Sequence, residues 1–566
     1  MKKVIYIYSL ISLLVTSACN DALDREIVMN LTADQVQKSY ERSRARINGI
    51  YTYLPWGLMY SDGAMMASAT DEAEHTLETC AIQKFNTGAW NQKDNPDGAW
   101  SNNFNGIYAA NLFIANSYDI EMDYYRLDPD ANKQESYQRC LTDIKRWRYE
   151  ARFLRAYFYF ELVKRYGGVP LITEPMDVES NFQIPRNALD TCFKFITAEC
   201  DSAARNLPEV YSDNVTNLGR VTKGAALALK SRALLYAASD LFNNPDKWAP
   251  GYAHPEYISN RTMDRDSLWE EAAKAAKAVI DLREANYSLS SDYPGLFKTY
   301  NNAEIILTRR GGSSNDFEKA NFPIGYDLGN SGTTPSQNLV DAYEMRDGSE
   351  FDWNTPAHKA APYSNRDPRL AYTVLLNNTN FNGRPVECWT GGKDGKGKSR
   401  ATKTGYYLNK YVNSELDLLQ GRTSVHSWII FRLAEIYLNY AEALNEYDPG
   451  NADIKIYVDK VRQRSGVNMP ALPNDLDQSK MKKRIQHERR IELAFEDHRF
   501  WDVRRWMIAP ETLGATLRGC EIISRGGLFE YNPIDVEKRT FTTKMYLYPI
   551  PESDLNIAGW DQNPLW

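Results

Sequence analysis

The stretch from Ile485 to Trp506, IQHERRIELAFEDHRFWDVRRW, constrains the fold more than any other part of the sequence. Its apolar residues recur at helical spacing and end in paired aromatics, which predicts a helix packed against a large partner surface. The side chains expected to face the core are Ile485, Ile491, Leu493, Phe495, Phe500 and Trp501. Charged residues stand three or four positions apart in the pairs Arg484 with Glu488, Arg489 with Glu492, and Glu496 with Arg499. We interpret these charges as a solvated or ion-paired helix face, since nothing singles out a catalytic carboxylate pair.

Similar helical segments dominate the rest of the chain. Helical periodicity with Gly or Pro at the ends predicts helices over 32–54, 100–118, 141–166, 188–207, 223–242, 267–283, 428–446, 452–465, 478–496 and 499–506. Small residues such as Ala434, Ala441 and Ala443 allow paired helices to cross closely, as in tetratricopeptide-type hairpins. The sequence therefore predicts a mainly α fold, a tetratricopeptide-like helical repeat scaffold.

The segment 286–424 breaks this pattern. It is rich in Gly, Asn and Pro and contains short β-like runs at 304–308 and 371–376, and the tail has another at 546–550. We predict a large loop-rich insertion with a few short strands, which contributes to ligand binding. The expected organisation is one continuous fold made of an N-terminal helical region (32–285), the insertion (286–424) and a C-terminal helical region with its tail (425–566).

The first residues have the pattern of an export signal. Two lysines, an apolar run and small residues precede Cys19, so residues 1–18 read as a signal peptide and 19–31 as a flexible tether. A cysteine at this place resembles the bacterial lipoprotein box, in which Cys19 is acylated and anchors the protein to a membrane. Thr16 stands where that box commonly has Leu, and an ordinary cleaved signal with a chance cysteine is the alternative. The other six cysteines are scattered and are expected to be buried free thiols.

Charge and known motifs exclude several functions. The net charge is −7 and no basic block could collect phosphates, so nucleic acid is not an expected partner. The segment 392–399 fits the P-loop pattern, but the residues after it do not open a helix, and we interpret it as a flexible Lys/Gly loop. Hydrolase nucleophile motifs, metalloprotease motifs and a complete EF-hand loop are absent from the sequence. No cofactor is expected, although a structural calcium is left open.

The aromatic residues give the strongest indication of a ligand. The chain has 36 Tyr and 13 Trp, and a sugar ring stacks its apolar face on such rings while Asn, Asp and Arg bind its hydroxyl groups. Trp100 with Asn103, at the start of a predicted helix after a long loop, fits this pattern, and core packing of Trp100 is an equal alternative. Asp71 in the preceding loop is another candidate contact, with helix capping or exposure to solvent as the alternative. Tyr293, Tyr326 and Trp353 in the insertion are candidate contacts, with local packing as the alternative.

Several long stretches, in a fixed order, resemble the SusD/RagB family of outer-membrane lipoproteins. They are the Cys19 leader, Trp100-x3-Phe104-x2-Ile107-x2-Ala110-Asn111, EARFLRAYFYFELVKRYGGVPLI at 150–172, FRLAEIYLNYAEALNE at 431–446, HERRIELAFEDHRFWDVRRW at 487–506, and YPIPESDLN with the terminal QNPLW. The resemblance runs nearly end to end. Leu565 stands where the family often has Gly.

The resemblance implies a non-catalytic protein on the outer membrane, lipid-anchored and facing the cell exterior. It implies that the protein captures oligosaccharide or polysaccharide and delivers it to a SusC-like, TonB-dependent transporter. In the type member a Trp with an Asn three residues on binds glycan, which Trp100 and Asn103 match, and Asp71 matches a preceding acid with looser spacing. A peptide ligand with the same transporter, or a helical glycoside hydrolase, are the alternatives. The sequence does not name the glycan, its linkage or the transporter-facing residues.

Overall fold

Long helices pack one on the next along the chain. The computed structural model describes residues 38–176, 183–213 and 215–566. The long helices are α5 (Ala99–Asn116), α7 (Ala131–Tyr166), α8 (Leu189–Asn206), α9 (Lys223–Ala238), α10 (Arg265–Ile280), α16 (Leu433–Tyr447), α17 (Asp453–Arg462) and α18 (Gln478–Glu492). Each of α5 to α9 contacts its successor, and α10 contacts α16 although the insertion lies between them in sequence. The prediction of a mainly α, tetratricopeptide-like scaffold is confirmed.

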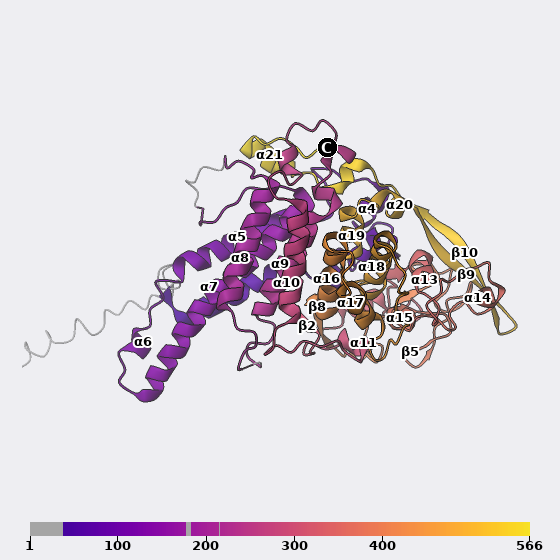
Figure 1. Cartoon of the computed structure of the whole chain (residues 1–566). Helices are drawn as coiled ribbons and strands as arrows, with labels where there is room; N and C mark the ends of the chain where they lie inside the picture. The colour runs from indigo at the N-terminus through magenta and orange to yellow at the C-terminus, as the bar shows by residue number, and fades with distance from the viewer. Residues whose placement is uncertain (1–37, 177–182, 214) are drawn as a thin grey trace, which may run out of the picture.

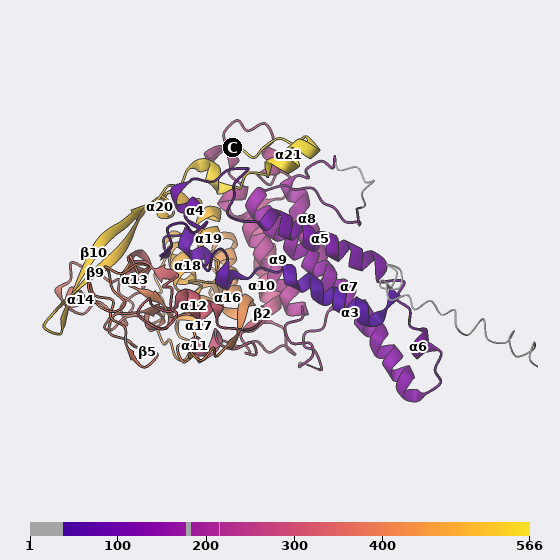
Figure 2. The ribbon, with the colours of Figure 1, turned by 180° about the vertical axis from the view of Figure 1, so that it is seen from behind.

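Two unlike regions stand on either side of the C-terminal helices. Figure 1 shows α5 to α10 on one side, the insertion and a long β-hairpin on the other, and α16 to α19 between them; Figure 2 shows the same order from behind. The shorter helices are α3 (Tyr40–Ile50), α4 (Gln83–Thr87), α6 (Asp123–Arg126), α11 (Tyr293–Leu296), α12 (Asp316–Asn321), α13 (Gln337–Ala342), α14 (Pro356–Ala360), α15 (Arg369–Thr373), α19 (Arg499–Arg505), α20 (Ala509–Thr512) and α21 (Glu552–Ala558).

Local sequence chemistry sets several helix ends. The side chains of Asp130, Thr222 and Asp264 accept hydrogen bonds from first-turn amides at the starts of α7, α9 and α10. Such caps satisfy amides that have no partner within the helix. At the other end, α7 stops at Gly167, whose φ of 73° lies in the left-handed region, and a side chain there would collide with the carbonyl oxygen of Tyr257.

Antiparallel strand pairs connect the insertion to the rest of the protein. Strands β2 (Ile305–Ser314) and β8 (Ser424–Arg432) pair antiparallel and join the two ends of the insertion. Strand β1 (Ala73–His75) pairs with β3 (Thr333–Pro335), which ties the first long loop to the insertion. The remaining pairs are β4 (Val374–Leu375) with β7 (Tyr407–Leu408), β5 (Asn380–Phe381) with β6 (Arg384–Pro385), and the hairpin of β9 (Thr516–Arg525) and β10 (Leu528–Lys538).

Several predicted boundaries were wrong. The helix expected over 428–446 begins only at Leu433, because Ser424–Arg432 is β8 and pairs with β2. The strand expected over 371–376 is the end of α15 followed by two residues of β4. The strand expected over 546–550 is absent from the described structure, where a 3-10 helix (Thr543–Tyr546) leads into extended chain. The β9–β10 hairpin was not predicted.

The stretch from Ile485 to Trp506 forms parts of two helices, as predicted over 478–496 and 499–506, but the first helix ends four residues earlier than expected. Helix α18 ends at Glu492 and α19 begins at Arg499, and between them Phe495 and Asp497 have φ values of 61° and 63°. The predicted core side chains from Ile485 to Trp501 are all buried. The three predicted local ion pairs are not among those formed by the described residues, and the charges bind distant partners instead: Glu488, for example, accepts from Arg369 at 2.5 Å and Arg462 at 2.9 Å.

Further predictions concern the N-terminus and the cysteines. Residues 1–18, Cys19, the tether 19–31 and the first residues of the predicted 32–54 helix lie outside the described residues, and α3 covers Tyr40–Ile50. Within the described ranges, no helix is long and apolar enough to cross a membrane. The six described cysteines are all buried and free, as expected.

Candidate functional site

The predicted pair Trp100 and Asn103 does not converge on one site. Both lie on α5, but Trp100 faces a surface pocket, whereas Asn103 turns into the core and its side-chain amide donates to the carbonyl oxygen of Ala99 at 2.7 Å. Only 6 % of Trp100 is exposed, and its ring packs edge-on against Tyr166 with centroids 4.8 Å apart. Trp100 therefore has a structural role and also forms part of a pocket wall.

Asp71 and Tyr293 lie inside the protein. The Asp71 carboxylate pairs with Arg490 at 2.9 Å and Arg499 at 2.8 Å. Burial alone would raise the pKa of Asp71, but these two guanidinium groups hold it well below its usual range. Tyr293 has no exposed surface, and its hydroxyl donates to the carbonyl oxygen of Glu492 at 2.9 Å. Neither side chain presents a surface that a ligand could contact in this structure.

Tyr326 and Trp353 lie nearer the surface of the insertion. Tyr326 lines a hollow of about 640 Å³, where the guanidinium of Arg384 sits 3.6 Å from its ring centroid and its hydroxyl donates to the Arg384 carbonyl at 3.0 Å. Trp353 is half-buried, and its indole donates to Asp341 at 2.9 Å. The six predicted contacts are thus spread over the molecule, and two of them, Trp100 and Tyr326, line cavities.

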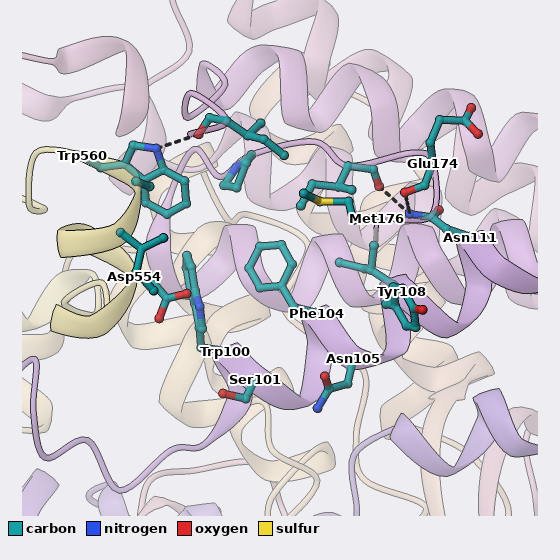
Figure 3. Close-up of a pocket in the computed structure, with 16 residues that line it drawn as sticks. Trp100, Ser101, Phe104, Asn105, Tyr108, Asn111, Glu174, Met176, Asp554 and Trp560 are labelled. Atoms are coloured by element: carbon teal, nitrogen blue, oxygen red, sulfur yellow. Dashed lines mark hydrogen bonds between the residues drawn. The ribbon is translucent and has the colours of Figure 1, made fainter. Parts of the chain in front are cut away.

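An aromatic cavity lies along α5. Trp100, Phe104 and Tyr108 stand four residues apart and form one stripe on the helix, which is one wall of a cavity of about 380 Å³ (Figure 3). The opposite wall comes from the segment after α7 and from α21 with the tail, including Ile172 and Trp560. We call this cavity the α5 pocket.

Ring geometry and polar groups suit the α5 pocket to a ligand with an apolar face and hydroxyl groups. Trp100 and Phe104 are tilted by 59° with centroids 4.9 Å apart, and Tyr108 is 48 % exposed. Ser101, Asn105 and Asp554 provide polar groups at the margin. A mainly apolar cavity with a few polar groups at its edge is the usual form of a small-molecule site.

Trp560 and Asn111 are fixed by hydrogen bonds. The Trp560 indole donates to the carbonyl oxygen of Ile184 at 2.7 Å, which holds its ring against the pocket. The Asn111 side chain donates to the carbonyl oxygen of Ile172 at 2.9 Å and accepts from Arg155 at 2.7 Å. Because these polar atoms already have partners, Asn111 shapes the wall and leaves ligand contact to the rings.

The Phe104–Tyr108–Trp560 set was not predicted from the sequence. The four-residue spacing of Trp100, Phe104 and Tyr108 is visible in the sequence and could have indicated the stripe. Trp560 could not have been found in this way, because it lies more than 400 positions from α5 in the chain.

A second aromatic surface lies beside the β9–β10 hairpin. Phe529 and Tyr531 lie on one face of β10, with Trp389 against the first ring at 5.3 Å and Tyr363 against the second at 5.0 Å. All four side chains are half-buried. This surface comes from the insertion and the C-terminal region together, so it depends on tertiary structure.

The described titratable groups form no metal-binding cluster, and their thiols are buried. Within residues 38–176, 183–213 and 215–566, no three His, Cys, Asp or Glu side chains are placed to hold a metal ion together. The described thiols are buried, and burial raises the pKa of Cys192 to about 12, which makes it a poor nucleophile.

Comparisons with known proteins agree over most of the chain. Residues 303–566 match the family model described as the SusD family, and residues 32–235 match the one described as "Starch-binding associating with outer membrane". A SusD-like protein (P25) of Formosa agariphila is 25 % identical over 81 % of this chain and 80 % of its own length. The crystal structure of a SusD-like protein from Bacteroides fragilis is 27 % identical, covers 94 % of this chain and 99 % of that chain, and has a TM-score of 0.77. The fold also matches a SusD-like carbohydrate-binding protein from Bacteroides fragilis, at 23 % identity and a TM-score of 0.74, over 92 % of this chain and 99 % of that one.

Proposed function

This chain belongs to the SusD family, and on that premise we propose that it is a non-catalytic, glycan-binding lipoprotein of the outer membrane. It captures oligosaccharide or polysaccharide at the cell surface. The observation that carries the proposal is the α5 pocket, a cavity of about 380 Å³ lined by the rings of Trp100, Phe104 and Tyr108 and by Trp560, which packs edge-on against Trp100 with centroids 6.3 Å apart. One structural neighbour is a SusD-like carbohydrate-binding protein and the N-terminal family is described as starch-binding, which supports the ligand class.

The α5 pocket can be tested with matched tyrosine variants. Tyr108 is 48 % exposed at the pocket and Tyr124 is 71 % exposed on α6, so replacing either by Ala leaves the core intact. Titration calorimetry against a panel of neutral oligosaccharides should show about two- to tenfold weaker binding for Tyr108→Ala, from the loss of one stacking surface, and no change for Tyr124→Ala. Wild-type affinity in both Tyr108→Ala and Phe104→Ala would remove the site from this pocket. Phe529→Ala would then test the second aromatic surface.

Ligand class and catalysis need separate measurements. Mass spectrometry of ligand that co-purifies with the protein distinguishes a saccharide from a peptide. Incubation with the bound glycan should release no new reducing ends, and any release that depends on the protein would contradict the non-catalytic role.

The membrane anchor and the transporter belong to the same proposal. Acylated Cys19 holds the protein on the outer membrane, and a SusC-like, TonB-dependent transporter receives the glycan. Cys19→Ala should move the protein from the membrane fraction to the soluble fraction. A barrel transporter should co-purify with the wild-type protein in detergent, and its absence would contradict the partnership.

A further inference from the structure

A groove far from the α5 pocket combines arginines with tyrosines and amides. One cavity of about 380 Å³ lies between α3, the loop before α9 and strand β2. A second, of about 160 Å³, adjoins it and shares Leu218, Gly219, Arg220 and Thr308. We call the two together the arginine groove. Strand β2 and helix α21, which borders the α5 pocket, lie well apart in both Figure 1 and Figure 2.

The larger cavity of this groove has arginines in its lining but no acidic residue to balance their charge. The larger cavity is lined by eleven residues that include Arg220, Arg309 and Arg310 and no Asp or Glu. Arg220 is neutralised by Glu150 at 2.7 Å. Within the described part of the chain, Arg309 and Arg310 form no ion pair. Two cationic side chains at one concave surface attract an anion.

The partners of these two arginines leave room for an anionic ligand. Arg309 donates to the carbonyl oxygen of Leu54, a neutral acceptor that leaves its charge uncompensated. Burial lowers the pKa of Arg309, with no carboxylate to oppose the shift. The Arg310 side chain is exposed, and its guanidinium lies 4.3 Å from the ring centroid of Tyr300. A partly buried cation without a counterion is costly, and an oxyanion that meets the guanidinium groups offsets that cost.

The smaller end of the groove has the chemistry of a sugar site. Tyr287 and Tyr300 provide rings, and the exposed Asn301 provides a side-chain amide. The side chains of Asn217 and Asn302 also line this end, but they are hydrogen-bonded to Arg146 and to Ser290. The only carboxylate lining the described groove, Glu209, is occupied by Lys223 at 3.2 Å and by the backbone amide of Glu284 at 3.0 Å. Rings beside amides suit the apolar face and hydroxyl groups of a pyranose.

We propose that the arginine groove binds an acidic saccharide, with a carboxylate or sulfate group at Arg309 and Arg310 and a sugar ring at Tyr300. This is a second site, on a different surface from the α5 pocket, and it requires a charged ligand. It therefore goes beyond the glycan capture proposed for the α5 pocket, and either role can fail without the other.

The test compares charged ligands with their neutral counterparts. The full chain is titrated with an oligogalacturonide and its methyl ester, and with dextran sulfate and dextran. The acidic member of at least one pair should bind about tenfold more tightly or better, because only it pairs with the guanidinium groups. The double variant Arg309→Gln with Arg310→Gln should lose that preference. Arg261→Gln, which removes one exposed charge elsewhere, should keep it.

The outcomes separate this proposal from the α5 pocket. Neutral-oligosaccharide binding that is weakened by Tyr108→Ala should be unchanged in the arginine double variant. Arg310→Glu, at an exposed position, gives a second variant if the double variant has a lower melting temperature than the wild type. Equal affinity for both members of each pair, or an undiminished preference in Arg310→Glu, would overturn the proposal. Competition by inorganic sulfate at the same concentration as the saccharide would overturn the saccharide part, since it would indicate a site for the free anion alone.

Discussion

The helical stack α5–α10 and the junction around α18 each have a buried core, but the two cores are built from different chemistry. In the stack, buried aromatics and alanines meet, as where Gly106 allows the Phe158 ring to pack against α5. At the junction, Glu488, Glu492 and Glu496 follow each other at four-residue spacing, and all three are buried among arginines. Packing between helices that follow each other in the sequence can be predicted from local patterns. A buried ion network cannot, because its partners are distant in the sequence.

Arg432 shows how the junction holds the insertion. It stands at the end of β8 and donates to Glu304, Glu492 and Glu496, each at 2.7 Å. Arg369 from the insertion shares one of these carboxylates, Glu492, to which it donates at 2.9 Å. Burial lowers the pKa of Lys410 to about 8 although Glu496 stabilises its charged form, because water has little access to this region. The charges of α18 therefore connect the insertion to the helical scaffold.

The largest expected effect is at Arg432. Arg432→Ala leaves three buried carboxylates without their shared partner, so the free energy of unfolding should fall by about 3–5 kcal/mol or more. Chemical denaturation followed by circular dichroism measures this loss. Arg525→Ala, which breaks an exposed pair with Glu530 at 3.1 Å, is the control and should cause little change. Similar stability in the two variants would mean that the junction is not held by its ion network.

Acid should weaken the charged region through Glu442. Burial raises the pKa of Glu442, but Arg505, Arg489 and the Trp506 indole together lower it to about 2. Because the folded-state pKa lies below the unfolded value near 4.5, the stabilisation is present above pH 4.5 and is lost as the pH falls through about 2.

The size of this effect is about 3 kcal/mol, at 1.36 kcal/mol per pKa unit. The free energy of unfolding, measured from pH 6 to pH 2, should therefore fall less steeply with decreasing pH for Glu442→Gln than for the wild type. Parallel curves would show that Glu442 does not contribute to the acid sensitivity.

The smallest expected effect tests the packing of the stack. In Gly106→Ala the new methyl group would lie 2.6 Å from the Phe158 ring, so overpacking should lower stability by about 1–3 kcal/mol. Gly49→Ala is the matched control, because Gly49 also lies in a helix but has nothing within 4 Å of its added methyl group. The control should gain about 0.5–1 kcal/mol from helix propensity. A gain in both variants would mean that α5 and α7 pack less closely than the structure shows.

The candidate site residues also differ in whether local sequence could predict their position. Trp100 was predicted and lines the α5 pocket, since its helix and its place after a loop are visible locally. Asn103, three positions after Trp100, faces the core, and the Asp71 and Tyr293 side chains are buried. Their sequence neighbours gave no sign of Arg490, Arg499 or the Glu492 carbonyl, which lie far along the chain. Composition can indicate a binding protein, but it does not say which rings reach the surface.

Local sequence patterns are enough to predict the helical scaffold, the loop-rich insertion, the family and the burial of the apolar residues between Ile485 and Trp501. Those features depend on periodicity, caps and motifs within a few turns of chain. In contrast, the burial of the charges in this stretch and their pairing with Arg369, Arg432 and Asp71 depend on the three-dimensional fold. The reason is physical: an ion pair between elements more than fifty residues apart leaves no local pattern, because either residue alone looks like an ordinary charge on a helix surface.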